Sequence, residues 1–420
     1  MKILLLHQYF LEENDPGGSR FNEMAKTWAE AGHDVTVLAG MVHYNGSDKR
    51  PEYKGRWFVR KQHDDVEVWR CHVPESYNRS FLGRLWAYFA FVFSSIYAGL
   101  FRIKGKYDVI LATSPPLFIG ITAYVLGRAK RLPIVFEVRD LWPESAIDTG
   151  VLMNPLIIRL SYWFEAFIYR RSRLVNVLTP AFREKLIDKG VPKDKILFIP
   201  NAADFSLSDE VLADFDRKAF RQKMGWDGKM VITYVGAHGV ANHLIQVLDT
   251  AELLQDTTEA HFVLIGNGMQ KPMLQEEAEK RNLRNVQFID SVPKREVFQY
   301  IAASDFGASI LKKVDTFKTI YSNKTFDYMS CRRPILMAID GVSRQLVEEA
   351  GCGLYVEPEN PRDFAARVKQ CLAMSSEVRR GLGEAGYAYA RTHFDRQRLA
   401  EQYLEHLRNL AKKQFNHVTN

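Results

Sequence analysis

The sequence predicts an α/β protein made of two successive domains, each built around a doubly wound parallel sheet. Two observations predict this fold class. Short apolar runs alternate with helix-like stretches in both halves of the chain, which is the pattern of a parallel sheet covered by helices. A polar stretch at residues 202–221 separates the two series. At about 150 residues per domain, 420 residues suffice for two large domains.

The first series of strands and helices is expected to form a domain over residues 1–203. A helix is expected at residues 21–31, after the first strand-like run and a loop. The predicted strands of this series are residues 2–6, 33–38, 107–112, 133–138, 174–179 and 196–200. No secretory signal precedes the first strand, so a cytoplasmic protein is expected.

The second series is expected to form a domain over residues 204–394. Its predicted strands are residues 230–236, 261–266, 286–290, 306–311, 334–339 and 353–358. Residues 395–420 begin as a charged helix that is expected to cross back to the first domain. The apolar face of this helix is formed by Leu399, Tyr403, Leu407 and Leu410.

The composition excludes several classes of protein. The chain is 46% hydrophobic and 25% charged, which is the balance of an ordinary globular protein and excludes disorder, collagen and coiled coil. Four cysteines are scattered without a C-x2-C pair, so neither a disulfide framework nor a thiolate zinc site is predicted.

The net charge of +7 is concentrated in one segment. Residues 76–131 contain eight basic side chains and one acidic side chain, a difference that equals the charge of the whole chain. They enclose the uncharged run 85–101, which is at the short limit for a membrane-spanning helix. The residues expected to contact anionic headgroups are Arg79, Arg84, Trp86, Arg102, Lys104 and Lys106. A buried core helix is the alternative, as it is for a second candidate surface at residues 162–173.

Glycines after strands indicate where a ligand binds. Two doubly wound domains place a ligand cleft at the carboxyl ends of their strands. A dinucleotide-binding oxidoreductase needs G-x-G-x-x-G directly after its first strand, whereas this chain has only Gly17 and Gly18 after a loop. These glycines precede a helix whose free N–H groups suit a phosphate, and a flexible loop into a helix cap fits them equally well.

In the second half, glycine turns follow two predicted strands, at residues 236–239 and 266–268. The stretch Ser322 to Met329 then places Lys324 on the first turn of a helix and Asp327 on the same face. An ammonium beside free N–H groups can hold a diphosphate, and a carboxylate can accept both hydroxyls of a ribose. A surface ion pair between these two side chains is the alternative.

Seven motifs then occur in an order and spacing that chance does not produce. They are PGGSRFNEMAKTWAEAGHDVTVLAG, FEVRDLWPESAIDTGVL, LTPAFREKLIDKGVPKDKILFIPNAAD, YVGAHGVANHL, LIGNGMQKPML, VPKREVFQYIAASDFGASI and YSNKTFDYMSCRRPIL. With them, essentially the whole chain resembles the retaining GT-B glycosyltransferases of family 4. It most resembles the bacterial group of N-acetyl-L-fucosamine transferase-like enzymes of O-antigen and capsule (lipopolysaccharide and surface polysaccharide) assembly.

The resemblance implies roles for individual residues of the donor site. Asp327 matches the second acid of the family's E-x7-E motif, which holds the ribose, and Thr319 stands where the first acid is usual. Lys324 matches the basic residue of an S-N-K signature, a diphosphate ligand. The Arg and Lys that many members carry after the glycine turn are absent. The resemblance implies that the donor is also bound by Asn323, His238, Gly239, Asn242, Gly266, Gly18 and Arg20.

The resemblance also implies a place for catalysis. Arg139 and Asp140 follow a predicted strand where many relatives present a histidine to the donor sugar. Asp140 is expected either to orient the acceptor hydroxyl or to stabilise positive charge on the anomeric carbon. Arg139 is expected to contribute to the same site or to act as the structural partner of Asp140.

The implied function is transfer of a sugar, expected to be an N-acetylated deoxy sugar, from a UDP-sugar to an undecaprenyl-diphosphate-linked glycan. The transfer retains configuration and needs no metal or other cofactor. It takes place peripherally on the inner face of the plasma membrane, and no nucleic acid is involved. Two alternatives stay open. One is a UDP-sugar 2-epimerase of the same architecture, and the other is a non-catalytic membrane scaffold, which the missing acid at Thr319 favours.

Overall fold

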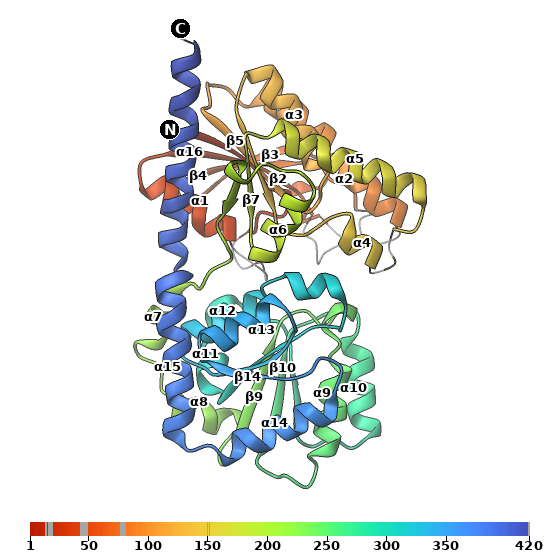
Figure 1. Ribbon diagram of the computed structural model, residues 1–420, viewed down its shortest axis with the longest axis vertical. Coiled ribbons are helices and arrows are strands. Elements are labelled where there is room, and N and C mark those ends of the chain that lie inside the picture. Colours follow the sequence, from red (N-terminus) through yellow and green to blue (C-terminus); the bar gives the residue numbers. More distant parts are fainter. Residues whose placement is uncertain are drawn as a thin grey trace. The chain divides into compact units, whose positions relative to one another are not determined.

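The computed structural model describes residues 1–12, 15, 20–42, 49–75, 81–148, 150 and 152–418 (Figure 1). Their contacts divide the chain into two compact units. The first unit contains Met1–Asp15, Ser19–Pro200 and Gln397–Asn420, and the second contains Asn201–Arg396. Each unit is a sheet with helices on both faces, so the predicted α/β class and the two doubly wound sheets are confirmed.

The sheet of the first unit has eight strands in the order β3-β4-β2-β1-β5-β6-β7-β8. Its strands are β1 (Lys2–Leu6), β2 (Asp34–Gly40), β3 (Phe58–His63), β4 (Val66–Cys71), β5 (Val109–Ser114), β6 (Ile134–Val138), β7 (Leu174–Val177) and β8 (Ile196–Phe198). All neighbours pair in parallel except β3 and β4, which form an antiparallel hairpin at one edge. This hairpin is an addition to the strands that the sequence predicts.

Helices cover both faces of this sheet. They are α1 (Arg20–Glu30), α2 (Phe81–Tyr97), α3 (Ile119–Lys130), α4 (Glu144–Asp148), α5 (Pro155–Arg171), α6 (Pro180–Asp188) and α16 (Arg396–Val418), and one turn of π-helix, Ala98–Arg102, extends α2. The long C-terminal helix α16 returns to the first unit, where the Trp28 indole N–H donates to the Ala400 carbonyl at 2.8 Å. Tyr403 packs edge-on against the same indole.

The sheet of the second unit has six parallel strands in the order β11-β10-β9-β12-β13-β14. They are β9 (Met230–Val235), β10 (Ala260–Ile265), β11 (Val286–Ile289), β12 (Phe306–Ile310), β13 (Ile335–Ala338) and β14 (Gly353–Tyr355). The helices are α7 (Phe205–Leu212), α8 (Arg217–Met224), α9 (Ile245–Leu253), α10 (Lys271–Lys280), α11 (Lys294–Ala303), α12 (Asn323–Ser330), α13 (Val342–Glu349), α14 (Pro361–Ala373) and α15 (Ser376–His393).

Two apolar layers hold the second unit together, one on each face of its sheet. On one face β9 and β10 pack against α9 and α14, with Phe262 and Phe364 in edge-to-face contact. On the other face β13 packs with α12 and α15 around Phe326 and Phe394. Because the faces of the sheet are filled in this way, ligands can approach at the ends of the strands, where loops replace side-chain layers.

Candidate active site

The helix α12 carries the predicted diphosphate signature, and buried side chains fix it against the sheet. The Tyr328 hydroxyl lies between β9 and β12, where it accepts from the Val235 N–H at 3.1 Å. It lies equally close to the carbonyl oxygens of Thr233 and Ala308, to which it can donate. The Tyr328 ring packs on Gly307, where an added Cβ would overlap it. The position of Lys324, one turn earlier on α12, therefore follows from the sheet.

Lys324 lies where a phosphate ligand is expected, at the carboxyl end of β9. Its ammonium is 4.6 Å from the centre of the Tyr234 ring, and its side chain packs against Gly236, the first residue after the strand. Burial lowers the pKa of Lys324 to about 8, and the negative charge of Asp327 acts in the opposite direction. Within the described part of the chain, no carboxylate lies within ion-pair distance of this ammonium. The expected alternative, a surface ion pair between Lys324 and Asp327, is therefore not formed.

Asp327 is held on one side by another helix. Its carboxylate lies 3.7 Å from the ammonium of Lys294, at the start of α11. Burial raises the pKa of Asp327, while the Lys294 charge opposes this shift. Asn323 is exposed at the first position of α12, and the Thr319 hydroxyl donates to the Thr316 carbonyl within its own turn. Ribose binding by Asp327 and a sugar contact by Thr319 stay predictions.

Two glycine turns lie side by side at the ends of β9 and β10. Gly236 and Gly266 have φ values of +144° and +142°, which favour glycine, and a Cβ at Gly266 would overlap the Gly236 carbonyl. The Lys271 ammonium holds the second turn by donating to the Gly266 carbonyl at 2.9 Å and pairing with Asp290 at 2.7 Å. Among the described residues the Gly239 N–H has no partner, so it can be offered to a ligand.

His238 does not occupy the position that the sequence suggested for it. Its ring is fully buried between Tyr234 and Phe288, and in the described part of the chain neither ring nitrogen has a hydrogen-bond partner. Burial and the charge of Lys271 lower the pKa of His238 to about 4, so the ring is neutral near pH 7. Its backbone N–H donates to the Asn267 carbonyl at 3.0 Å. His238 therefore joins the two glycine turns instead of facing a phosphate, whereas Asn242, in the 3-10 helix that follows, remains partly exposed.

Arg20 is a structural residue, which corrects its expected role as a phosphate ligand. It is almost fully buried, and its guanidinium pairs with the buried Glu137 carboxylate through two contacts of 3.1 Å. It also donates to the carbonyl oxygens of Ile199, at 2.7 Å, and Pro200. Asn176 donates to the same carboxylate at 2.9 Å. Gly18, which was expected to act beside Arg20, lies outside the described residues.

The candidate catalytic residues follow β6 in the first unit. Asp140 is partly buried and accepts from the Ser145 hydroxyl at 2.8 Å. Burial raises the pKa of Asp140, and the nearby Glu144 charge adds to the shift. Burial holds the pKa of the His7 ring well below its usual range, and the positive charges of Arg139 and Arg70 add to this shift. A catalytic role for Asp140 or Arg139 stays a prediction.

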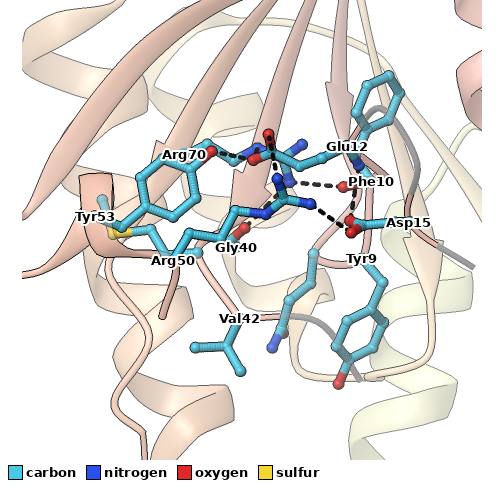
Figure 2. A pocket seen from close by; sticks show the side chains of 11 residues that line it. Tyr9, Phe10, Glu12, Asp15, Gly40, Val42, Arg50, Tyr53 and Arg70 are labelled. Atoms are coloured by element: carbon cyan, nitrogen blue, oxygen red, sulfur yellow. Dashed lines mark hydrogen bonds and ion pairs between the residues drawn. The ribbon is translucent and has the colours of Figure 1, made fainter. Parts of the chain in front are cut away.

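A cavity of about 190 Å³ opens at the carboxyl ends of β1, β2 and β4 in the same unit (Figure 2). Figure 2 shows Arg70 and Tyr53 grouped around the Glu12 carboxylate, and Arg50 extended toward Asp15 at 2.5 Å. Gln8, which also lines the cavity, is 1% exposed, and neither amide atom has a partner among the described residues. A buried amide without partners costs about 1–3 kcal/mol, so a polar ligand in this cavity would satisfy it.

The predicted membrane residues lie on α2 and just after it, except for Arg79, which lies outside the described residues. Arg84, Trp86, Arg102, Lys104 and Lys106 are all exposed. The stretch Gly83–Arg102 is long and apolar enough to be a candidate span, with a mean hydropathy of 1.3 and 39% of its window buried within the protein. Four aromatic side chains, Trp86, Phe93, Tyr97 and Phe101, are exposed at helical spacing along it.

Sequence reasoning missed several residues that shape these sites. Glu137 had a detectable signal, because it is one acid inside the apolar strand β6. Lys271 opens α10 directly after a glycine turn, which is a weaker signal of the same kind. Gln8 and Arg50 had none, since only the folded sheet brings the ends of β1 and β4 to one cavity.

Two doubly wound sheets, the second with a lysine and glycine turns at its strand ends, define a glycosyltransferase of the GT-B fold. The comparisons with known proteins agree. Residues 17–202 match the family "Glycosyl transferase 4-like domain", and residues 229–374 match "Glycosyl transferases group 1". Both matches are to glycosyltransferase domains, and the chain is an enzyme of the hexosyltransferase type.

Individual proteins also resemble this chain, two of them over 97% of its length. The putative colanic acid biosynthesis glycosyl transferase WcaI of Escherichia coli K12 is 24% identical over 97% of this chain and 100% of its own length. The α-D-kanosaminyltransferase of Streptomyces kanamyceticus is 22% identical over 59% of this chain and 64% of its own. Among solved structures, HepE of Anabaena in complex with UDP has a TM-score of 0.68 at 20% identity, covering 97% of this chain and 100% of that one.

Proposed function

We propose that this enzyme transfers a sugar from a UDP-sugar to an undecaprenyl-diphosphate-linked glycan in bacterial surface polysaccharide synthesis, with retention of configuration and without a metal. One observation carries the proposal. The Lys324 ammonium, which has no carboxylate partner among the described residues, lies beside a glycine turn at the end of β9, where a diphosphate can bind. The names of the relatives support it, since HepE was solved with UDP and WcaI is named for colanic acid biosynthesis.

The donor would bind to the second unit through a small set of groups. Lys324, the free Gly239 N–H and the first N–H groups of α12 would hold the diphosphate. Asp327 would accept the ribose hydroxyls beside Lys294. These donors would face oxygens whose negative charge grows as the bond to the sugar breaks, and such electrostatic stabilisation speeds departure of the leaving group.

The transfer itself would proceed by attack of the acceptor hydroxyl on the face of the sugar that the diphosphate leaves. A leaving phosphate oxygen would take the proton of that hydroxyl. Asp140, whose pKa is raised by burial, would orient the hydroxyl or stabilise positive charge on the anomeric carbon. The assignment of an N-acetylated deoxy sugar rests on the family resemblance.

The acceptor would bind to the first unit at a membrane surface. The exposed aromatic face of α2, with Arg84 before it and Arg102, Lys104 and Lys106 at and after its end, fits a helix that lies in the headgroup region. Because 39% of its apolar window is buried within the protein, we propose a peripheral contact rather than a span. The cavity beside Gln8 is suited to one polar sugar of the acceptor.

The donor assignment is tested with Lys324→Ala. Thermal shifts with UDP-, GDP- and dTDP-sugars identify the donor, and turnover is then measured with the donor that stabilises most. Removing a charge-assisted contact worth about 1.5–3 kcal/mol should weaken UDP binding roughly 10- to 150-fold. The matched control is Lys369→Ala, an exposed lysine on α14 of the same unit. Wild-type affinity and turnover in Lys324→Ala would contradict the proposal.

The membrane contact and the two alternatives need separate assays. Replacing Arg84, Arg102, Lys104 and Lys106 with Gln should release the enzyme from anionic vesicles, and unchanged sedimentation would contradict the contact at α2. Conversion of a UDP-sugar to its epimer without acceptor would identify an epimerase. Transfer to a polyprenyl-diphosphate-linked sugar would dismiss the non-catalytic scaffold.

A further inference from the structure

A second cavity lies at the amino ends of the strands of the first unit's sheet, whereas Asp140 lies at their carboxyl ends. It measures about 870 Å³ and is bordered by residues that precede the strands, such as Pro133 before β6 and Arg173 before β7. The charged side chains that line it are Arg128, Arg131, Arg170, Arg171, Arg173, Lys195 and Asp194. Among the described residues that line it, six cations thus meet one carboxylate, an excess that none of the roles described above uses.

The fold accounts for part of this charge. Arg128 and Arg131 end α3, and Arg170 and Arg171 end α5, where cations complement the helix dipole. The Lys195 ammonium donates to the Arg170 carbonyl at 3.0 Å. Burial lowers the pKa of Lys195, and the charge of Arg173 adds to the shift. The charge of Asp194 opposes this shift only in part, and an anionic ligand would relieve the repulsion between Lys195 and Arg173.

The helix α5 also presents an apolar stripe that leads to the cavity. Leu156, Leu160, Trp163, Phe167 and Arg171 follow one another at intervals of three or four residues, so they share one face of the helix. Leu156, Leu160 and Trp163 are 66%, 54% and 61% exposed. The Arg171 guanidinium lies 5.5 Å from the Phe167 ring centre. The stripe thus passes from exposed apolar side chains to a lining residue of the cavity.

We propose that the α5 stripe and this basic cavity form a docking surface for anionic phospholipid. The stripe would enter the boundary of headgroups and acyl chains, and the cavity would take the phosphate of a headgroup. A soluble anion would use the cavity and leave the apolar stripe without a role. The helix α3 contacts both α2 and α5 (Figure 1), so this surface and the α2 contact belong to one layer of helices. The proposal rests on a membrane-bound acceptor, as proposed above.

The test measures binding of the full chain to phosphatidylcholine vesicles with and without phosphatidylglycerol. One variant replaces five cavity residues, Arg128, Arg131, Arg170, Arg171 and Arg173, with Gln. A second replaces Leu156, Leu160 and Trp163 with Ser. The control removes five exposed charges from the second unit, replacing Lys218, Lys223, Arg284, Lys369 and Arg380 with Gln.

The cavity variant should bind anionic vesicles at least about tenfold more weakly than wild type, since each cation near such a surface contributes about 1 kcal/mol. The stripe variant should also bind at least about tenfold more weakly, because interfacial binding scales with the apolar area that enters the boundary of headgroups and acyl chains. The control should stay within about twofold. Brominated lipid should quench part of the wild-type fluorescence, and Trp163→Phe should reduce that quenching, with exposed Trp86 on α2 accounting for the remainder. Wild-type vesicle binding by the cavity variant would overturn the proposal. Loss in the cavity variant with full binding by the stripe variant would identify a site for free anions and also overturn it.

Failure of the docking surface and failure of the proposed function remain distinguishable. UDP binding, measured by calorimetry without vesicles, depends on the second unit, and we expect it to be unchanged in both surface variants. Absence of UDP-sugar binding in the wild type would count against the proposed function alone. A thermal melt of each variant tests whether the first unit is folded. We expect it to be folded, because the replaced side chains lie at the surface.

Discussion

The buried pair of Arg20 and Glu137 allows a sharp test, because sequence and structure give Arg20 different roles. Arg20→Leu removes four hydrogen bonds and leaves the Glu137 carboxylate buried without its cation. Removal of one partner from a buried ion pair costs about 3–5 kcal/mol. For a unit of this size, about 2–4 °C per kcal/mol predicts a loss of roughly 6–20 °C in the melting temperature of the first unit.

Differential scanning calorimetry with and without UDP measures both roles in one experiment. We expect the first unit to melt earlier in Arg20→Leu, while the affinity for UDP stays within about twofold of wild type. Arg183→Leu, at an exposed arginine of α6, serves as the control and should change little. The double variant Arg20→Leu, Glu137→Leu should recover part of the loss, since no charge is then left buried. An unchanged melting temperature with weakened UDP binding would refute the structural role and restore Arg20 as a phosphate ligand.

Three further predictions concern the second unit. Because the pKa of Lys324 is about 8, its cationic form predominates at pH 7 and is the minor form at pH 9, so affinity for UDP should fall across this range in calorimetric titrations. Lys324→Arg, which does not titrate there, should flatten the profile, and a wild-type profile without a fall would count against the assignment. Gly307→Ala should force Tyr328 off the sheet, cost about 1–3 kcal/mol in denaturant unfolding and weaken UDP binding; full binding would show that α12 is placed by other contacts. Gly266→Ala should destabilise the unit similarly, whereas Gly381→Ala, in open space on α15, should be neutral or stabilise by up to about 1 kcal/mol; equal effects would argue against the close approach of the two turns.

The order of strands along each unit could be predicted because buried parallel strands read as continuous apolar runs. The hairpin β3-β4 lacked that signal. Its strands FVRKQH and VEVWRC mix charged with apolar side chains, and β3 lies at an edge of the sheet, where Arg60 is exposed. The same reasoning placed Lys324 on a short helix, which the structure forms as α12.

Individual side chains were harder to predict than elements, because their partners are remote in sequence. Arg20 and Glu137 are separated by 117 residues, and an arginine at the start of a helix reads as a phosphate ligand until its carboxylate is known. The role of His238 was hard to predict for the same reason, because a histidine after a glycine turn suggests a residue that binds a ligand. Only the packing of Tyr234 and Phe288 around it shows that the ring is buried.

Basic residues that the fold brings together in one cavity are far apart in the sequence, so a count over one sequence segment separates them. Counting along the sequence places the whole excess of +7 in residues 76–131 and directs attention to α2. The cavity takes Arg128 and Arg131 from the end of that window and joins them to Arg170, Arg171, Arg173 and Lys195, which the window leaves out. The helices α3 and α5 end where the strands β7 and β8 begin, at the amino ends of the strands. They meet there because every parallel crossover returns the chain to that end of the sheet. Each basic residue at the end of a helix is common at such a position. The topology of the sheet brings several of them together in one site.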